Sequence, residues 1–295
     1  MKKIAFATLI ILTFLLLGVE SCEKATTAEN GIVMNFVENA PAKVVATDQT
    51  VNIYVDIANK GASNVNKGEA KFYLINAAKN LDGVTTKLSN TNLLETGITA
   101  STARLIFAKN AKVLLDIKDP FLLTLSLKSC YPYDTDVRTK ICIARENNPI
   151  CSITGEKITS TSNSAGPIKV TSLKEEVVAN KLMLTAIIEN KGVQEKSIGD
   201  VYLKSANCDI LQDVTNTNYI DELLKEKKVD VEIKTTGFKC NLEEDTKGTI
   251  SLTNNKGILT CEKKLEAESE ETQFQLLLHY KYQDSITTAI TLVKS

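Results

Sequence analysis

The stretch VNIYVDIANKG, residues 51–61, alternates apolar and polar side chains and ends in Asn59 and Gly61. A second stretch, LMLTAIIENKG at residues 182–192, repeats both the alternation and the ending. Alternation with a period of two is the pattern of a half-buried β-strand. Asn-x-Gly is expected to end each strand because Asn and Gly tolerate positive φ. The sequence therefore predicts two equivalent strands far apart in the chain.

A second pair of similar stretches follows in the same order. Residues 130–143 read CYPYDTDVRTKICI and residues 279–292 read HYKYQDSITTAITL, so that Tyr131 matches Tyr280 and Tyr133 matches Tyr282. Each stretch is predicted to form a hairpin, with a polar turn at residues 134–136 in the first. Tyrosines spaced by two share a sheet face. Their repetition favours a packing role over a binding stripe.

Two ordered echoes indicate two copies of one domain. The segment ITSTSNSAGP, residues 158–167, has the composition of a linker. Short strand-like runs recur between turn residues in both halves, and residues 219–228 are the best helix candidate. The fold class is therefore predicted to be all-β, with two tandem Ig-like β-sandwich domains at residues 30–158 and 167–295 and a linker at 159–166.

The N-terminus has the pattern of an export signal. Lys2 and Lys3 precede an apolar run at residues 4–18, which as a helix spans about 22 Å, less than a membrane core. Cys22 follows Ser21 as in a lipoprotein signal, although Glu20 departs from that pattern. We expect a signal peptide at residues 1–21, lipid on Cys22 and a tether at 22–29. An uncleaved membrane segment is the alternative anchor.

The remaining six cysteines are expected to form disulfides, since an even number in an exported chain indicates a covalent framework. The candidates are Cys130, Cys142, Cys151, Cys208, Cys240 and Cys261. Expected pairs are Cys130–Cys142, with Cys142–Cys151 as the rival, and Cys240–Cys261. Three cysteines lie in each half, so full pairing needs at least one bridge between the halves.

Few residues suggest catalysis or ligand binding. His279 is the only histidine and lies in an expected strand, so a structural role is favoured over a catalytic triad. Asp134 and Asp136, with Asp116 and Asp119, are more simply explained by turns than by calcium binding. The chain lacks Trp, and its net charge of −1 gives no case for nucleic acid. We expect no catalytic residue, no metal, no cofactor and no enzyme activity.

The chain resembles uncharacterised archaeal cell-envelope proteins with tandem Ig-like domains of the CARDB-like kind. The similar motifs are GIVMNF at residues 31–36, the two Asn-x-Gly endings, the cysteine–tyrosine stretch at 130–143, Ala165-Gly166-Pro167 and the closing segment at 278–292. The resemblance implies fold and surface location and carries no functional residue.

The expected function is that of a non-catalytic, membrane-anchored surface protein. It would contact other envelope proteins as a component or scaffold, with exposed sheet edges as docking sites. An adhesin or ligand-binding module using loops at one end of a sandwich is the alternative, and an enzyme is the less favoured one.

Overall fold

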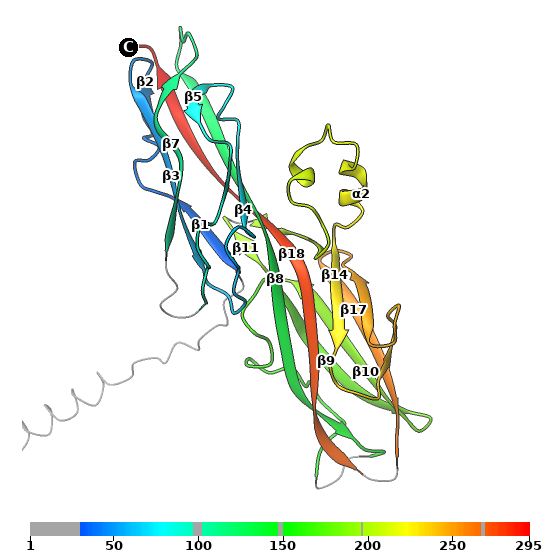
Figure 1. Ribbon diagram of the computed structural model, residues 1–295. Helices are drawn as coiled ribbons and strands as arrows, with labels where there is room; N and C mark the ends of the chain where they lie inside the picture. The colour runs from blue at the N-terminus through cyan, green and yellow to red at the C-terminus, as the bar shows by residue number, and fades with distance from the viewer. Residues whose placement is uncertain (1–29, 97–101, 147–149, 196, 267–268) are drawn as a thin grey trace, which may run out of the picture.

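The computed structural model of the protein describes residues 30–96, 102–146, 150–195, 197–266 and 269–295. These residues form an elongated all-β body in which sheets pack face to face (Figure 1). The predicted signal peptide, Cys22 and the tether lie outside the described residues. Among the residues described, no helix is both long and apolar enough to cross a membrane.

Two long strands run the length of the molecule, and the remaining strands of the largest sheet pair on either side of them. β8 (Phe121–Ile143) and β18 (Glu270–Val293) pair antiparallel from Phe121↔Leu292 to Ile143↔Glu270 (Figure 1). The two hairpins predicted at residues 130–143 and 279–292 are therefore wrong. Each stretch continues as one strand because alternation persists through its polar centre, where the outward-facing residues are polar or charged. The exception is Asp284, a charged residue at an inward-facing position.

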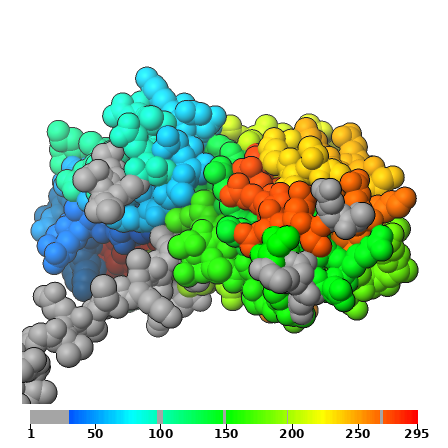
Figure 2. Space-filling model, turned by 90° about the horizontal axis from the view of Figure 1, so that it is seen from below, coloured from blue at the N-terminus to red at the C-terminus, as the bar shows by residue number. Residues whose placement is uncertain are grey.

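At one end, β8 and β18 complete a sandwich with the first part of the chain. β4 (Lys71–Ile75) pairs with β8, β6 (Lys87–Ser89) pairs with β4, and β2 (Val44–Ala46) pairs parallel with β18. The facing sheet has the order β1-β3-β7-β5, formed by β1 (Ile32–Phe36), β3 (Thr50–Asn59), β7 (Ala103–Val113) and β5 (Leu81–Val84). The C-terminal part of β18 thus lies among N-terminal strands, and Figure 2 shows red beside blue.

At the other end, the same two strands join the second part of the chain. β13 (Asp200–Leu203) and β14 (Lys228–Ile233) pair with β18, and β16 (Lys247–Ser251) pairs with β14. The facing sheet has the order β15-β17-β10-β9, formed by β15 (Lys239–Cys240), β17 (Lys256–Lys264), β10 (Lys181–Asn190) and β9 (Ile168–Val178). A ribbon of β11 (Val193–Gln194) and β12 (Ser197–Ile198) follows β10.

The two ends share one core. A single cluster of buried apolar side chains includes Ile53 and Leu125 from one end and Leu184 and Leu276 from the other. Residues 159–166, the expected linker, are hydrogen-bonded to β8, since Arg138 N donates to Ser162 O and Ser164 N donates to Asp136 O, both at 2.8 Å. The division into domains at this segment stays a prediction.

Four buried tyrosines mark the centre of the molecule. Tyr131 lies opposite Tyr282, and Tyr133 lies opposite Tyr280. All four side chains are at most 1% exposed, so the packing role expected for them agrees with their burial. In the repeat, Tyr131 is equivalent to Tyr280 and Tyr133 to Tyr282. The two equivalent stretches, one on β8 and one on β18, therefore pair with each other. The pairing of β8 with β18 consequently has an approximate two-fold axis through the Pro132↔Lys281 pair.

The Asn residues of the two Asn-x-Gly endings accept hydrogen bonds from two of these central tyrosines. Tyr133 Oη donates to Asn59 Oδ1 at 3.3 Å, and Tyr282 Oη donates to Asn190 Oδ1 at 3.2 Å. Burial raises the pKa of Tyr133 to about 12, so its hydroxyl stays a donor. The positive-φ explanation was wrong, because neither Asn and neither following Gly has positive φ.

The glycines are needed for close approach instead. A Cβ on Gly61 would lie 1.7 Å from Tyr133 Oη, and one on Gly192 would lie 2.3 Å from Tyr282 Oη. No methyl group fits at either distance. Gly61 therefore leaves room for the hydroxyl of Tyr133, and Gly192 leaves room for the hydroxyl of Tyr282.

One segment departs from the repeat. Residues 204–227, here called the insertion, leave the sheet between β13 and β14 and hold η1 (Ile210–Gln212) and α2 (Tyr219–Leu223) (Figure 1). The helix lies within the predicted range 219–228 but is shorter. The insertion packs by Leu211 and Leu223 against Tyr202 of β13.

Candidate functional site

Three neighbouring strands bring the only histidine to the outer face of the long sheet. Asp230 of β14, His279 of β18 and Asp134 of β8 are register partners in one row. The interior positions on either side of this row in β8 and β18 are buried, and all but Thr135 are apolar or aromatic, such as Tyr133 and Tyr280. Alternation therefore turns His279 and the carboxylates outward.

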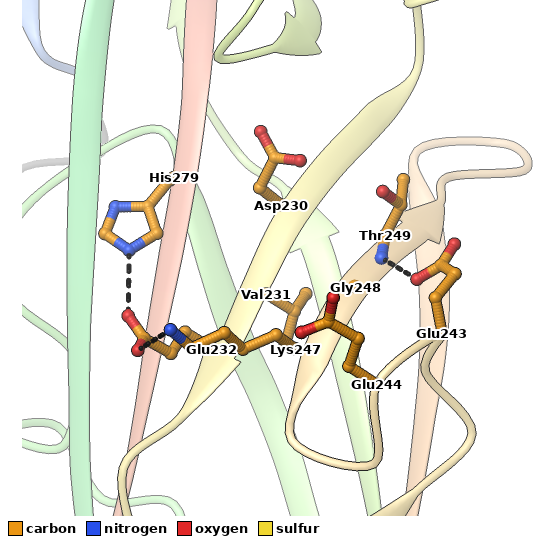
Figure 3. Close-up of a pocket in the computed structure, with 9 residues that line it drawn as sticks. All are labelled: Asp230, Val231, Glu232, Glu243, Glu244, Lys247, Gly248, Thr249 and His279. Carbon is orange, nitrogen blue, oxygen red and sulfur yellow. Dashed lines mark hydrogen bonds and ion pairs between the residues drawn. The ribbon is translucent and has the colours of Figure 1, made fainter.

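A shallow groove lies beside His279. It has a volume of about 530 Å³ and is lined by Asp230, Val231, Glu232, Glu243, Glu244, Lys247, Gly248, Thr249 and His279 (Figure 3). Four of these residues carry carboxylates and one is a lysine, so the wall is predominantly acidic. Glu243 closes one side, where its Oε2 accepts a hydrogen bond from Thr249 N at 2.7 Å.

Both nitrogens of His279 face carboxylates. Nδ1 lies 2.6 Å from Asp134 Oδ1. Nε2 lies 3.8 Å from Glu232 Oε2, a contact drawn in Figure 3. Burial raises the pKa of Asp134, but the hydrogen bond from His279 and the nearby Lys204 ammonium outweigh it and leave this pKa below its usual value. Lys234 and Lys247 lower the pKa of Glu232 to about 2. The carboxylates are ionised.

This arrangement is an ion-pair network. Within the described part of the chain, no serine, threonine or cysteine side chain is hydrogen-bonded to His279. A base for nucleophilic catalysis needs one nitrogen free to accept a proton from such a group. Here the second nitrogen faces Glu232, which in turn is held by Lys234 at 2.8 Å and Lys247 at 3.0 Å.

The turn carboxylates singled out in the sequence have other surroundings. Asp134 and Asp136 lie within β8 rather than on a turn. Asp136 pairs with Arg138 at 2.6 Å, whereas Asp116 and Asp119 are exposed in the connection between β7 and β8. In the described ranges, no group of three or more His, Cys, Asp or Glu residues is arranged to hold a metal ion.

The six cysteines form three disulfides: Cys130–Cys208, Cys142–Cys151 and Cys240–Cys261. The predicted Cys130–Cys142 bridge is wrong, because both residues lie on β8 and twelve residues of extended chain span about 40 Å. The rival Cys142–Cys151 forms, and the expected bridge between the halves is Cys130–Cys208. Disulfides of this number indicate an oxidising, extracytoplasmic compartment.

Cys240 and Cys261 pair as predicted. β16 and β17 follow one another in the chain but belong to different sheets. Cys240 of β15 is the register partner of Cys261 of β17. The bridge thus links two neighbouring strands of the facing sheet.

Sequence reasoning missed the insertion, although the repeat contains its signal. Asn59 and Asn190 are 131 residues apart, whereas Tyr131 and Tyr280 are 149 apart, so the second copy has 18 more residues between the two echoes. The unequal spacing places an insertion between residues 190 and 280. Only the structure shows that it folds back over the centre of the long sheet.

Comparisons with known proteins give no family. No family model matches the chain, and no curated protein matches it. Among solved structures, the secreted serine protease VesC from Vibrio cholerae is 8% identical, with 84% of this chain and 49% of that chain covered and a TM-score of 0.19. This chain thus spans about half the length of that protease. A similarity this weak supports no statement about fold or activity.

Proposed function

We propose that the protein is a non-catalytic, exported surface protein, anchored to the membrane through its N-terminal segment, that acts by contacting other envelope proteins. Its two halves are proposed to be copies of one Ig-like sandwich, in keeping with the resemblance to archaeal envelope proteins. The observation that carries this proposal is that three strongly exposed apolar side chains lie on the insertion.

Val214, Leu224 and Ile220 are 72%, 64% and 63% exposed. They are the three most exposed large apolar residues among those the structure describes, and all three lie on the insertion. We call them the apolar knob. Exposed apolar side chains gathered on one element are typical of protein interaction sites. A catalytic role leaves them unexplained.

The insertion is also held rigidly enough to present a fixed surface. Cys208 joins it to Cys130 of β8, and Asp209 accepts a hydrogen bond from Tyr73 Oη and pairs with Lys87 at 2.8 Å. A contact surface that is already ordered loses less conformational entropy on binding. The insertion therefore favours docking of a folded partner.

Strand addition to the sheet edges, by contrast, is opposed at several places. Glu195 Oε2 accepts from Thr287 N of β18 at 2.9 Å, and Glu156 Oε1 accepts from Leu173 N of β9 at 2.6 Å. Thr249 N of β16 is taken by Glu243. Carboxylates on edge amides prevent backbone pairing with another chain. We therefore assign the protein contact to the apolar knob instead of to these edges.

The test is co-purification from membranes after chemical cross-linking. A triple variant, Val214→Ser with Ile220→Ser and Leu224→Ser, is expected to lose the cross-linked partner. The matched control is Ile106→Ser with Leu122→Ser and Ile258→Ser, which removes three comparably exposed apolar side chains elsewhere. Equal recovery of a partner with both variants contradicts the assignment to the knob, and recovery of none with the wild type contradicts the function.

A further inference from the structure

A second pocket lies at the centre of the outer face, around the two-fold axis. It has a volume of about 330 Å³ and is lined by Gly68, Glu69, Lys71, Pro132, Lys204, Asn207, Cys208, Asp209 and Lys281. Its floor is the Pro132↔Lys281 pair, and its wall is the start of the insertion. The pocket thus lies where the two halves of the molecule meet.

Lys281 is unusual among the partly buried lysines. Lys157 pairs with Glu175 at 3.0 Å, and Lys225 pairs with Glu222 at 2.8 Å. Lys281 is half-buried, yet no carboxylate of the described residues lies within ion-pairing distance, and its Nζ donates to the carbonyl oxygen of Ala206. Burial lowers the pKa of Lys281, since an ammonium withdrawn from water without a counter-ion is destabilised.

Lys71 lies in the same pocket and also lacks an ion pair. Its Nζ donates to Ser89 Oγ at 3.2 Å, and no carboxylate of the described residues pairs with it. Lys204, the third lysine, lies 3.2 Å from Asp134 Oδ1, with its side chain 48% exposed. The pocket is therefore lined by three lysines, and the ammonium groups of two of them, Lys71 and Lys281, have only uncharged acceptors among the described residues.

The acidic residues of the pocket are already engaged. Asp209 is bound by Lys87 at 2.8 Å and by the hydroxyl of Tyr73. Glu69 Oε2 accepts from Asn66 N at 3.0 Å. Neither carboxylate lies near enough to Lys281 to pair with it, although both contribute a favourable field there. The charged groups of the pocket that lack an oppositely charged partner among the described residues are therefore the ammonium groups of Lys281 and Lys71.

We propose that this pocket binds a compact oxyanion, such as a phosphate, a sulfate or a small carboxylate, held by Lys281 and Lys71 with Lys204 at the rim. Oxygens of such an anion accept charge-assisted hydrogen bonds from ammonium groups. The ligand would join β4 of the first half to β18 and the insertion of the second. It would brace the wall that Cys208 already fixes.

Isothermal titration calorimetry of the purified full chain tests the site, with inorganic phosphate, sulfate and succinate against chloride of matched ionic strength. Lys281→Met is expected to weaken binding by about tenfold, since it removes the most desolvated charge. Lys71→Gln is expected to weaken it by about threefold, because the Lys71 ammonium already donates a hydrogen bond to Ser89 Oγ. The control, Lys227→Gln, removes a neighbouring exposed charge outside the pocket and leaves affinity unchanged.

The location is read from backbone amide shifts. Saturating phosphate is expected to move the signals of Asn207, Cys208 and Asp209 in the wild type and in Lys227→Gln but not in Lys281→Met. Binding of phosphate and sulfate alone identifies a tetrahedral anion, whereas binding of succinate alone identifies a carboxylate. Lack of binding beyond that of chloride, or unchanged affinity in folded Lys281→Met and Lys71→Gln, overturns the proposal.

Discussion

The two ends of the molecule make the same central contacts but differ beside the long strands. Tyr133 with Asn59 at one end has the same hydrogen bond as Tyr282 with Asn190 at the other. On the outer side, β4 pairs with residues 126–130 of β8, and β14 pairs with the equivalent part of β18 after the insertion. The shared contacts are those that the interior requires, and the difference lies where the sheet faces solvent.

The two ends also differ at one buried position of the long strands. Thr135 of β8 and Asp284 of β18 occupy equivalent buried positions. Thr135 Oγ1 donates to Ile168 O at 2.8 Å, whereas the Asp284 carboxylate accepts only from Ser285 N, at 2.9 Å, among the described residues. Burial, and then the charges of Asp200 and Glu195, raise the pKa of Asp284 to about 7. The repeat is thus broken at one interior group that titrates.

The largest expected effect comes from separating the two halves, because each half uses a part of both long strands. A chain of residues 30–158 lacks residues 284–293, which form the β18 part between β8 and β2. We expect no cooperative unfolding transition for this fragment by circular dichroism, because its sheet loses a central strand. Adding a peptide of residues 270–295 is expected to restore the transition. Cooperative melting of the fragment alone would show that the shared strands are dispensable.

The bridge between the halves is expected to stabilise more than the local one. Removing Cys130–Cys208 by a double alanine variant should lower the free energy of unfolding by about 4 kcal/mol, and removing Cys142–Cys151 by about 3 kcal/mol, since the closed loop is longer in the first. Urea denaturation without reductant measures both. A larger loss for the Cys142–Cys151 variant contradicts this ranking.

The two glycines sharpen the comparison at the centre. Gly61→Ala is expected to lower the free energy of unfolding by about 3 kcal/mol, because its methyl group collides with Tyr133 Oη. Combining it with Tyr133→Phe should recover part of the loss, as the hydroxyl is gone. Gly192→Ala with Tyr282→Phe is the matched cycle at the other end. Additive effects in either cycle rule out a direct contact between the two side chains.

The buried Asp284 is expected to make stability depend on pH. Its folded-state pKa is above the unfolded value of 3.8, so the folded protein binds the proton more tightly, and stability falls as pH rises from about 4 to about 7. Asp284→Thr copies the residue of the other half and removes this loss. The variant should match the wild type below pH 4 and exceed it by about 4 kcal/mol at pH 8, the free-energy equivalent of a pKa raised from 3.8 to about 7.

Thermal unfolding of both proteins across this range measures the difference. Asp284→Asn serves as the isosteric control, since it removes the charge and keeps the shape. A constant difference between variant and wild type at every pH would mean that the carboxylate is not the titrating group.

Much of the secondary structure could be predicted from local pattern. The period-two runs at residues 51–61 and 182–192 correspond to β3 and β10. Alternation is a property of neighbouring residues, so it can be read without knowing partners. The candidate groove could not be predicted, because Asp134, Glu232 and His279 are far apart in sequence and meet only through strand register.

The sequence by itself determined the strands, the duplicated tyrosines and the even set of cysteines, all of which depend on residue type and spacing. The tertiary structure decided that residues 130–143 and 279–292 continue straight, which cysteines meet, and why Gly61 and Gly192 are glycines. Apart from the local Cys142–Cys151 and Cys240–Cys261 bridges, these outcomes depend on contacts between segments 70 or more residues apart. A polar centre in an alternating run reads locally as a turn, and only pairing with a second long strand keeps it extended.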